Sequence, residues 1–331
     1  MTSTSARTVE AIADFAALVP RITGSISAVS SFLIIYLVFR SEAKLNTIYH
    51  RIMFGMSVAD ILSSIAMALT TLPMPKNDDP WWTEDPWMNK WYLGEAFWEE
   101  QTKIGNRQTC TIQGFFFATG VIIMFSYNGM LFVYYACAIA LRMKEETIRK
   151  RIQPFIIGMP VIQGLCSTVP ALIYGYYNPI RNEAWCTLYP MGDFPVYGKW
   201  FGFVLGLYFA IFFGEIVISL ALIIWRVLQN GRTLARRDDQ EDTPQHIDQR
   251  VRAAHRNSKL IIVQSLAYAG AFFLTISFPF IRNIYNKHLS DTQIDVLNKL
   301  MVTFMPLQGF FNFVIFLWHK GTIFVFSIGG L

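Results

Sequence analysis

Seven long apolar stretches, separated by clusters of charged residues, limit what this chain can fold into more than any other feature. They cover residues 16–39, 48–73, 110–141, 153–176, 200–225, 259–281 and 296–318. A helix needs about 20 mostly apolar residues to cross the hydrocarbon core of a bilayer. The composition agrees, because 15% of the residues are charged, whereas soluble domains carry about 25%. The sequence therefore predicts an all-α membrane protein in which residues 1–331 form one bundle of seven transmembrane helices.

The lysines and arginines predict which way this bundle faces. Of the 28, 17 fall in the loops 40–51, 142–152 and 226–259 or after residue 318, and 11 fall on the other side. Cytoplasmic loops carry an excess of lysine and arginine. We therefore expect the N-terminus outside, the C-terminus in the cytoplasm, and a multi-pass protein of the plasma membrane.

Two of the four cysteines lie where a disulfide is stable. Cys110 is at the outer entrance of span three, and Cys186 is in the middle of the second outer loop. Disulfides persist on the oxidising, extracellular side of a membrane. We expect a Cys110–Cys186 bond that pins this loop over the mouth of the bundle, the alternative being two unpaired thiols.

Polar side chains inside the spans are costly and often functional. Asp60 and Glu215 are the only acidic residues in span interiors, and Asn128, Gln308 and Asn312 lie at similar depths on other helices. Gln308 and Asn312 are one helical turn apart, so they share a face. The five residues are candidates for one buried polar cluster that exchanges hydrogen-bond partners between two arrangements of the bundle. Their alternative role is to hold helices together.

The first outer loop, residues 74–109, is rich in tryptophan and in acidic residues. Tryptophan favours the membrane interface, so one interpretation is a loop that lies along the lipid headgroups. Aromatic rings also recognise cations, which makes the loop a candidate vestibule for a cationic or amphipathic ligand. The vestibule candidates are Trp81, Trp82, Trp87, Trp91 and Trp98.

The predicted cytoplasmic side offers a docking surface for a partner. The loop 226–259 is basic at both ends and acidic in its centre, and we expect its ends to extend spans five and six as helices. The candidates for contact with a cytoplasmic partner are Arg142, Arg149, Lys150, Arg151, Arg256 and Lys259. The alternative is attraction to anionic lipid headgroups alone.

Other classes of function lack the residues that they need. A transporter or channel is the main alternative, but no internal repeat relates spans one to three to spans five to seven. A retinal protein needs a lysine within a span, whereas Lys299 lies at the outer end of span seven. The five histidines are scattered over loops and span ends, so we expect no enzyme, no metal and no other cofactor. No basic stripe with interleaved aromatic residues predicts a nucleic acid partner.

Seven spans, a cysteine pair and an aspartate in span two together resemble a G-protein-coupled receptor. The stretch Ser57-Val-Ala-Asp60 is similar to the Ser/Leu-x-Ala-Asp motif of span two. Pro306-Leu-Gln-Gly-Phe-Phe-Asn312 resembles the Leu-Gln-Gly-Phe-x-Asn segment of span seven in the cyclic-AMP-receptor-like and secretin-like groups. The rhodopsin-like Asp/Glu-Arg-Tyr triplet is absent from the inner end of span three, and Phe316 stands where that class has tyrosine.

This resemblance implies a function and a set of partners. An extracellular ligand, which the sequence does not name, would open the inner face of the bundle. A cytoplasmic heterotrimeric G protein would then exchange its nucleotide. The partners implied are the G protein, the ligand and membrane lipid.

Overall fold

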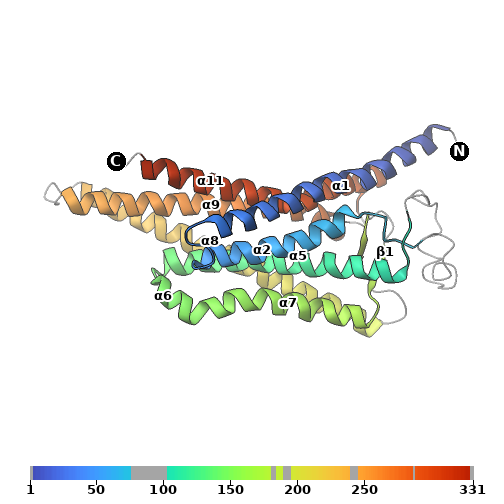
Figure 1. Cartoon of the computed structure of the whole chain (residues 1–331), viewed down its shortest axis with the longest axis horizontal. Helices are drawn as coiled ribbons and strands as arrows, with labels where there is room; N and C mark the ends of the chain where they lie inside the picture. The colour runs from blue at the N-terminus through green and yellow to red at the C-terminus, as the bar shows by residue number, and fades with distance from the viewer. Residues whose placement is uncertain are drawn as a thin grey trace.

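The computed structural model describes residues 3–75, 103–179, 184–188, 195–238, 245–285 and 288–328. Within these ranges, seven helical segments are long and apolar enough to cross a membrane, judged by length and composition. They are Ala17–Arg40, Ile48–Ala68, Arg107–Ala140, Glu145–Ile173, Gly206–Arg226, Ile262–Arg282 and Thr292–Trp318. The helices run along the long axis of the molecule, and the two ends of the chain lie at opposite ends of it (Figure 1). The predicted bundle of seven membrane helices is confirmed.

The spans are built from the following elements. Spans one and two lie in α1 (Ser3–Arg40) and α2 (Ile48–Ala68), and span three is α5 (Arg107–Tyr135) with the π-helical turn η2 (Ala136–Ala140). Span four combines α6 (Glu145–Thr147), the π-helical turn η3 (Ile148–Ile152) and α7 (Gln153–Ile173). Spans five and six lie in α8 (Pro195–Asp238) and α9 (Gln245–Tyr285). Span seven combines α10 (Asp291–Phe304), the 3-10 turn η4 (Met305–Leu307) and α11 (Gln308–Ile328).

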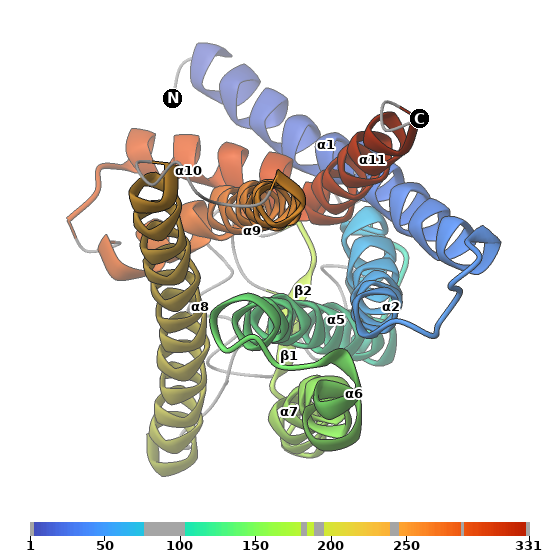
Figure 2. The same ribbon diagram turned by 90° about the vertical axis from the view of Figure 1, so that its left-hand side faces the viewer.

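Helix α5 lies in the middle of the bundle, with α2, α7, α8 and α9 arranged around it (Figure 2). Most of its residues are buried, as is usual for a helix that is apolar on all sides. A stack of phenylalanines joins it to α8 and α9: the Phe272 ring lies 4.9 Å from that of Phe125 and 5.0 Å from that of Phe212, both edge to face. These aromatic contacts hold three spans together near the centre of the molecule.

The two ends of the bundle differ in construction. At one end, β1 (Tyr177–Pro179) and β2 (Cys186–Leu188) pair antiparallel and lie against α5. We call this the outer end, and the opposite end the inner end, after the orientation predicted from the sequence. At the inner end α8 and α9 continue beyond the candidate spans to Asp238 and from Gln245, so the predicted helical extensions are confirmed.

Several span boundaries differ from the sequence prediction, among them the end of span two and the start of span four. Helix α2 ends at Ala68 rather than near residue 73, because Thr70 adopts a left-handed conformation (φ 48°) and the chain turns. The Gln113 amide on α5 donates to the carbonyls of Ala66 and Thr70 at 2.9 and 2.7 Å, which satisfies acceptors left open at a helix end. Span four begins at Glu145 rather than at 153, so Arg149, Lys150 and Arg151 lie in a helical turn.

Candidate functional site

A partly open cavity lies between the hairpin and the helices at the outer end of the bundle. Its volume is about 260 Å³. Side chains of α5, the hairpin, α9, α10 and η4 line it: Phe117, Ala118, Val121, Ile122, Phe125, Trp185, Thr187, Leu188, Thr275, Ile276, Pro279, Phe280, Met301 and Met305. The lining is mostly apolar with two threonine hydroxyls, which suits a small, largely apolar ligand.

The hairpin forms the cap of this central cavity. The Cys110–Cys186 disulfide joins it to α5, which confirms the predicted bond. The Cys186 backbone N–H also donates to the Gln113 side chain at 3.0 Å. Trp185 is fully buried, with its ring 5.5 Å from that of Phe117. The cap is therefore held by a covalent bond, a buried hydrogen bond and an aromatic contact.

The hairpin that forms the cap is also hydrogen-bonded to α7. The Tyr177 hydroxyl on β1 donates to the Thr168 carbonyl of α7 at 2.9 Å. Burial raises the pKa of the Tyr177 hydroxyl well above its ordinary value. Tyr177 therefore stays neutral across the physiological range, and this attachment of the hairpin to α7 does not depend on pH in that range.

Asp60 on α2 sits in a nest of hydroxyl groups and is fully buried. Its carboxylate accepts hydrogen bonds from Ser31 at 2.8 Å, from Ser27 at 3.2 Å and from Ser64 at 3.3 Å. Ser27 and Ser31 lie one turn apart on α1, so the aspartate joins the first two spans. Hydrogen bonds of this kind compensate the cost of burying a carboxylate.

Gln308 and Asn312 form a second polar group, on α11. The Gln308 amide donates to the Asn312 side chain at 3.2 Å, so these residues interact one turn apart. The Gln308 oxygen accepts from the Thr275 hydroxyl of α9 at 2.7 Å. Thr275 also lines the central cavity. A ligand in the cavity would therefore lie beside a residue that is hydrogen-bonded to span seven.

The backbone around Gly309 connects the two polar groups. The Gly309 N–H donates to the Ser27 hydroxyl at 2.8 Å, and Ser27 in turn donates to Asp60. A Cβ atom at position 309 would collide with the Asp60 carboxylate and with the Ser31 hydroxyl. Only glycine permits this close approach. The turn η4, with Pro306 near its start, precedes the glycine and separates α10 from α11.

Asn128 and Glu215 lie apart from this network. The Asn128 amide donates to the Met124 carbonyl of its own helix at 3.1 Å, and its oxygen is buried with no hydrogen-bond partner in the described part of the chain. Glu215 on α8 is half-buried and lies against Gly129, the residue after Asn128. Three of the five predicted residues thus belong to one network, and Asn128 and Glu215 lie outside it, so the five do not form a single cluster.

A further hydrogen-bonded group, which the sequence did not reveal, lies toward the inner end. We call it the tyrosine tie: Tyr49 on α2, Tyr268 and Gln264 on α9. The Gln264 amide donates to the Tyr49 hydroxyl at 3.1 Å, and the Tyr49 and Tyr268 hydroxyls lie 3.2 Å apart. Tyr268 in turn donates to the Met53 sulfur at 3.6 Å. The tie therefore connects spans two and six directly.

Aromatic rings surround the tyrosine tie. The Tyr49 ring stacks on Phe316 of α11 at 6.3 Å and on Tyr135 of α5 at 6.5 Å. The Tyr135 hydroxyl and the Gln264 oxygen are buried without a hydrogen-bond partner among the described residues. These two atoms can accept new partners if the inner ends of the helices shift.

The predicted G-protein-facing residues gather at the inner end where they can be placed. Arg142 follows η2 with a positive φ of 51° and is exposed. Arg149, Lys150 and Arg151 are exposed on η3, and Lys150 pairs with Glu146 at 2.8 Å. Positions 256 and 259 lie on α9, but the Arg256 and Lys259 side chains lie outside the described side chains. The five vestibule tryptophans, Trp81, Trp82, Trp87, Trp91 and Trp98, lie outside the described residues.

The geometry defines a class of protein. It is a seven-helix membrane protein with a capped cavity at one end, a buried polar network in the middle and hydrogen-bonded tyrosines toward the other end.

The lysine considered above for a retinal protein, Lys299 in span seven, pairs with Asp295 at 2.9 Å and does not line the central cavity.

Comparison with known proteins supports the same architecture. No protein-family model and no curated protein sequence matches the chain. Among solved structures it is similar to squid rhodopsin, with a TM-score of 0.68 and 13% sequence identity over 93% of this chain and 77% of that one. At this identity the similarity shows the fold, which is the rhodopsin-like bundle of seven helices.

Proposed function

We propose that this protein is a G-protein-coupled receptor that carries an extracellular signal to a cytoplasmic heterotrimeric G protein. One observation carries the proposal above the others. Thr275 lines the capped cavity and donates to Gln308, which lies next to the glycine hydrogen-bonded to Ser27. A ligand-sized space is thus in contact with hydrogen bonds that connect spans one, two, six and seven.

The signal begins with a ligand in the central cavity. A ligand changes the populations of two bundle states only through its different affinity for them. Contact with Thr275 or Phe125 provides such a difference, because these residues belong to the polar network and to the phenylalanine stack. In the resting arrangement the Gln308 side-chain oxygen accepts a hydrogen bond from Thr275. A state in which α9 moves must therefore break this bond or move Gln308 together with α9.

The response occurs at the inner end, where the tyrosine tie joins α2 to α9. Outward movement of the inner part of α9 separates the Tyr49 and Tyr268 hydroxyls. The loss of one such hydrogen bond costs about 1 kcal/mol, an amount that ligand binding readily supplies. The gap then exposes a surface bordered by the basic residues of η3 and by α9 around positions 256 and 259, where a G protein would dock.

The motif in span seven supports membership of the cyclic-AMP-receptor-like or secretin-like groups. In the Pro306–Asn312 segment, three motif residues make contacts that require their particular side chains. Gln308 and Asn312 bond to each other, and Gly309 allows the approach to Asp60. We place the receptor in the plasma membrane with its N-terminus outside, in agreement with the distribution of basic residues.

Nucleotide exchange on purified G proteins tests the proposal without a known ligand. The full chain, reconstituted in nanodiscs, is offered to a panel of heterotrimers as wild type and as Tyr268→Phe. Removal of one hydroxyl from the tyrosine tie destabilises the resting state by about 1 kcal/mol, so basal exchange is expected to rise about fivefold on the matching heterotrimer. Asp60→Asn is expected to change exchange as well, because the network loses its charged acceptor.

A matched control removes charge from the docking surface. The triple change Arg149→Ala, Lys150→Ala and Arg151→Ala is expected to lower exchange in the Tyr268→Phe background without altering the thermal stability of the bundle, because these side chains are exposed. If no heterotrimer responds to any variant while the protein remains folded, the receptor proposal fails. Solute flux in proteoliposomes would then support the transporter or channel alternative.

A further inference from the structure

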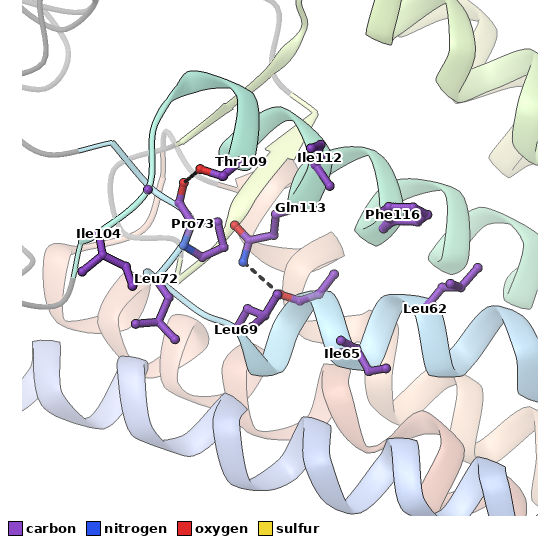
Figure 3. A pocket seen from close by; sticks show the side chains of 12 residues that line it. Leu62, Ile65, Leu69, Leu72, Pro73, Ile104, Thr109, Ile112, Gln113 and Phe116 are labelled. Atoms are coloured by element: carbon purple, nitrogen blue, oxygen red, sulfur yellow. Dashed lines mark hydrogen bonds between the residues drawn. The ribbon is translucent and has the colours of Figure 1, made fainter.

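The central cavity differs from a groove between α2 and α5 in the state of its polar groups. In the groove, which Figure 3 shows, the Gln113 amide is bonded to backbone carbonyls, and the Thr109 hydroxyl donates to the Pro73 carbonyl at 2.8 Å. The lining of the central cavity instead includes polar groups that make no hydrogen bond within the described part of the chain. These groups indicate what a ligand in the central cavity must carry.

The indole N–H of Trp185 requires an acceptor. Trp185 lines the central cavity and is 1% exposed, yet its N–H has no hydrogen-bond partner among the described residues. A buried tryptophan N–H usually has a partner, and it can act only as a donor. The Thr187 hydroxyl on the same hairpin is also unbonded within the described ranges, but a hydroxyl can donate or accept and so adds no preference.

Thr275 on α9 requires the opposite group, a donor. Its hydroxyl lies 2.7 Å from the Gln308 oxygen and 2.9 Å from the Phe272 carbonyl, and it donates to both. The single hydroxyl hydrogen is therefore already used, whereas the oxygen keeps lone pairs that can accept. A polar ligand atom that faces Thr275 must carry a hydrogen of its own.

The charges around the central cavity disfavour an ionic ligand. None of its lining residues is ionisable. A charged ligand would lose its hydration there without forming an ion pair, which is unfavourable. Arg282 lies beside the lining, with its guanidinium 3.8 Å from the Met301 sulfur, but does not itself line the cavity. Its positive charge further disfavours a cation.

The size and the walls of the central cavity favour a single aromatic ring. The volume of about 260 Å³ lies below the range of about 300–1,000 Å³ that is usual for drug-sized ligands. Aromatic rings pack favourably against other rings and against thioethers. Four aromatic side chains and two thioethers contribute to the lining: Phe117, Phe125, Trp185, Phe280, Met301 and Met305.

We propose that the central cavity binds a small, uncharged aromatic alcohol, whose hydroxyl donates to Thr275 and whose oxygen accepts from the Trp185 N–H. An alcohol supplies both the donor and the acceptor, whereas an ether or a ketone supplies only the acceptor. The inference rests on the proposed function in treating this cavity as the ligand site, and it adds the chemical class of the ligand. This class differs from the cationic ligand that the tryptophan-rich loop 74–109 suggests.

Four probes that share one aromatic skeleton test the proposal: 2-phenylethanol, its methyl ether, 2-phenylethylamine and phenylacetate. Saturation-transfer NMR measures the affinity of each for the full chain in nanodiscs, and empty nanodiscs correct for partition into lipid. We expect saturable binding of the alcohol. The ether should bind about fivefold more weakly because it lacks the donor. The ammonium and the carboxylate should each bind at least about tenfold more weakly, because each buries a charge.

Three variants test the two proposed hydrogen bonds. Thr275→Val should lower the affinity for the alcohol about fivefold and leave the affinity for the ether unchanged, since only the alcohol donates. Trp185→Phe removes the indole N–H and should lower the affinity for both probes. Thr119→Val is the matched control, because Thr119 is a buried threonine that donates to Thr168 and does not line the central cavity. It should bind the alcohol as the wild type does.

Several results would overturn the proposal: no saturable binding of the alcohol, tighter binding of the ammonium or the carboxylate, or equal effects of Thr275→Val and Thr119→Val. Unchanged affinity in a folded Trp185→Phe variant would do so as well, and if this variant does not fold, the threonine pair decides. Binding needs no G protein, and nucleotide exchange by Tyr268→Phe needs no ligand. Binding of the alcohol without exchange on any heterotrimer would therefore support the ligand class and count against the receptor function alone.

Discussion

The outer and inner ends of the bundle are held together by different chemistry. At the outer end a disulfide, the Gln113 hydrogen bonds and the buried Trp185 fix the hairpin to α5. At the inner end, the tyrosine tie joins α2 to α9, and the Tyr49 ring stacks on Phe316 of α11. Two buried polar atoms there, on Tyr135 and Gln264, have no partner among the described residues.

This difference indicates where the bundle can move. Opening the outer end breaks a covalent bond or several buried contacts at once, which together cost more than a single hydroxyl–hydroxyl hydrogen bond. Opening the inner end costs about 1 kcal/mol for each hydrogen bond of the tie that breaks, and it offers new partners to the Tyr135 hydroxyl and the Gln264 oxygen. We therefore propose that the ligand binds at the rigid end and that the conformational response occurs at the weakly tied end.

The largest effect is expected from removal of the disulfide. Replacing both cysteines, Cys110→Ala with Cys186→Ala, releases a loop that spans 76 residues, and the chain-entropy cost for such a loop is about 4 kcal/mol. Thermal unfolding in nanodiscs should show a large loss of stability. Cys166→Ala removes an exposed free thiol and should leave the unfolding temperature unchanged. Equal stability of the double variant and the wild type would mean that the outer end is not the rigid one.

A smaller effect is expected in the middle of the bundle, at Gly309. A methyl group there collides with Asp60 and Ser31, and overpacking of this kind costs about 1–3 kcal/mol. Gly309→Ala should lower the unfolding temperature and change basal nucleotide exchange, since the network must rearrange. Gly214→Ala is the matched control, because a Cβ there meets nothing within 4 Å. Similar behaviour of the two variants would show that the approach to Asp60 is unimportant.

Thr275→Val tests the connection between the two ends. The substitution keeps the shape of the side chain and removes the donor to Gln308, which leaves a buried oxygen unsatisfied at a cost between about 1 and 2 kcal/mol. We expect a changed basal exchange rate with little change in the stability of the hairpin, measured by hydrogen exchange at residues 184–188. Unchanged exchange would place the cavity outside the signalling path.

The smallest change in stability is expected from a substitution in the tyrosine tie. Tyr268→Phe removes the bonds to Tyr49 and Met53 and should lower stability by about 1 kcal/mol while raising basal exchange about fivefold. Tyr208→Phe removes a hydroxyl that bonds to Ser126 and Ile122 between α5 and α8, away from the tie. It should lower stability by a similar amount without raising exchange, and a rise of equal size in both variants would count against the tie.

Much of the fold could be predicted from the sequence because membrane spans depend on local apolar length. Their ends could not, because α2 stops where Gln113, from another helix, bonds to its last carbonyls. The interaction of Gln308 with Asn312 follows from helical spacing. The partners of Asp60 do not, since Ser27 and Ser31 come from another span and serine is common in such helices.

The tyrosine tie is a clearer example of an interaction that the sequence does not predict. Tyr49 and Tyr268 are 219 positions apart, and neither belongs to a motif that the sequence displays. Their proximity depends on how α9 packs against α2, which single-sequence periodicity does not determine. One residue of the sequence pointed to this region: Phe316, in a position where rhodopsin-like receptors have tyrosine, packs against the Tyr49 ring.

Distance measurement by paired spin labels tests the central claim, that the inner end opens while the outer end stays fixed. Labels at Lys150 and Arg256 report the inner end, and labels at Tyr174 and His288 report the outer end, in protein that carries Cys166→Ala. We expect Tyr268→Phe to add a longer-distance population to the inner pair and to leave the outer pair unchanged. A change in the outer pair, or an inner pair that keeps its wild-type distribution, would contradict it.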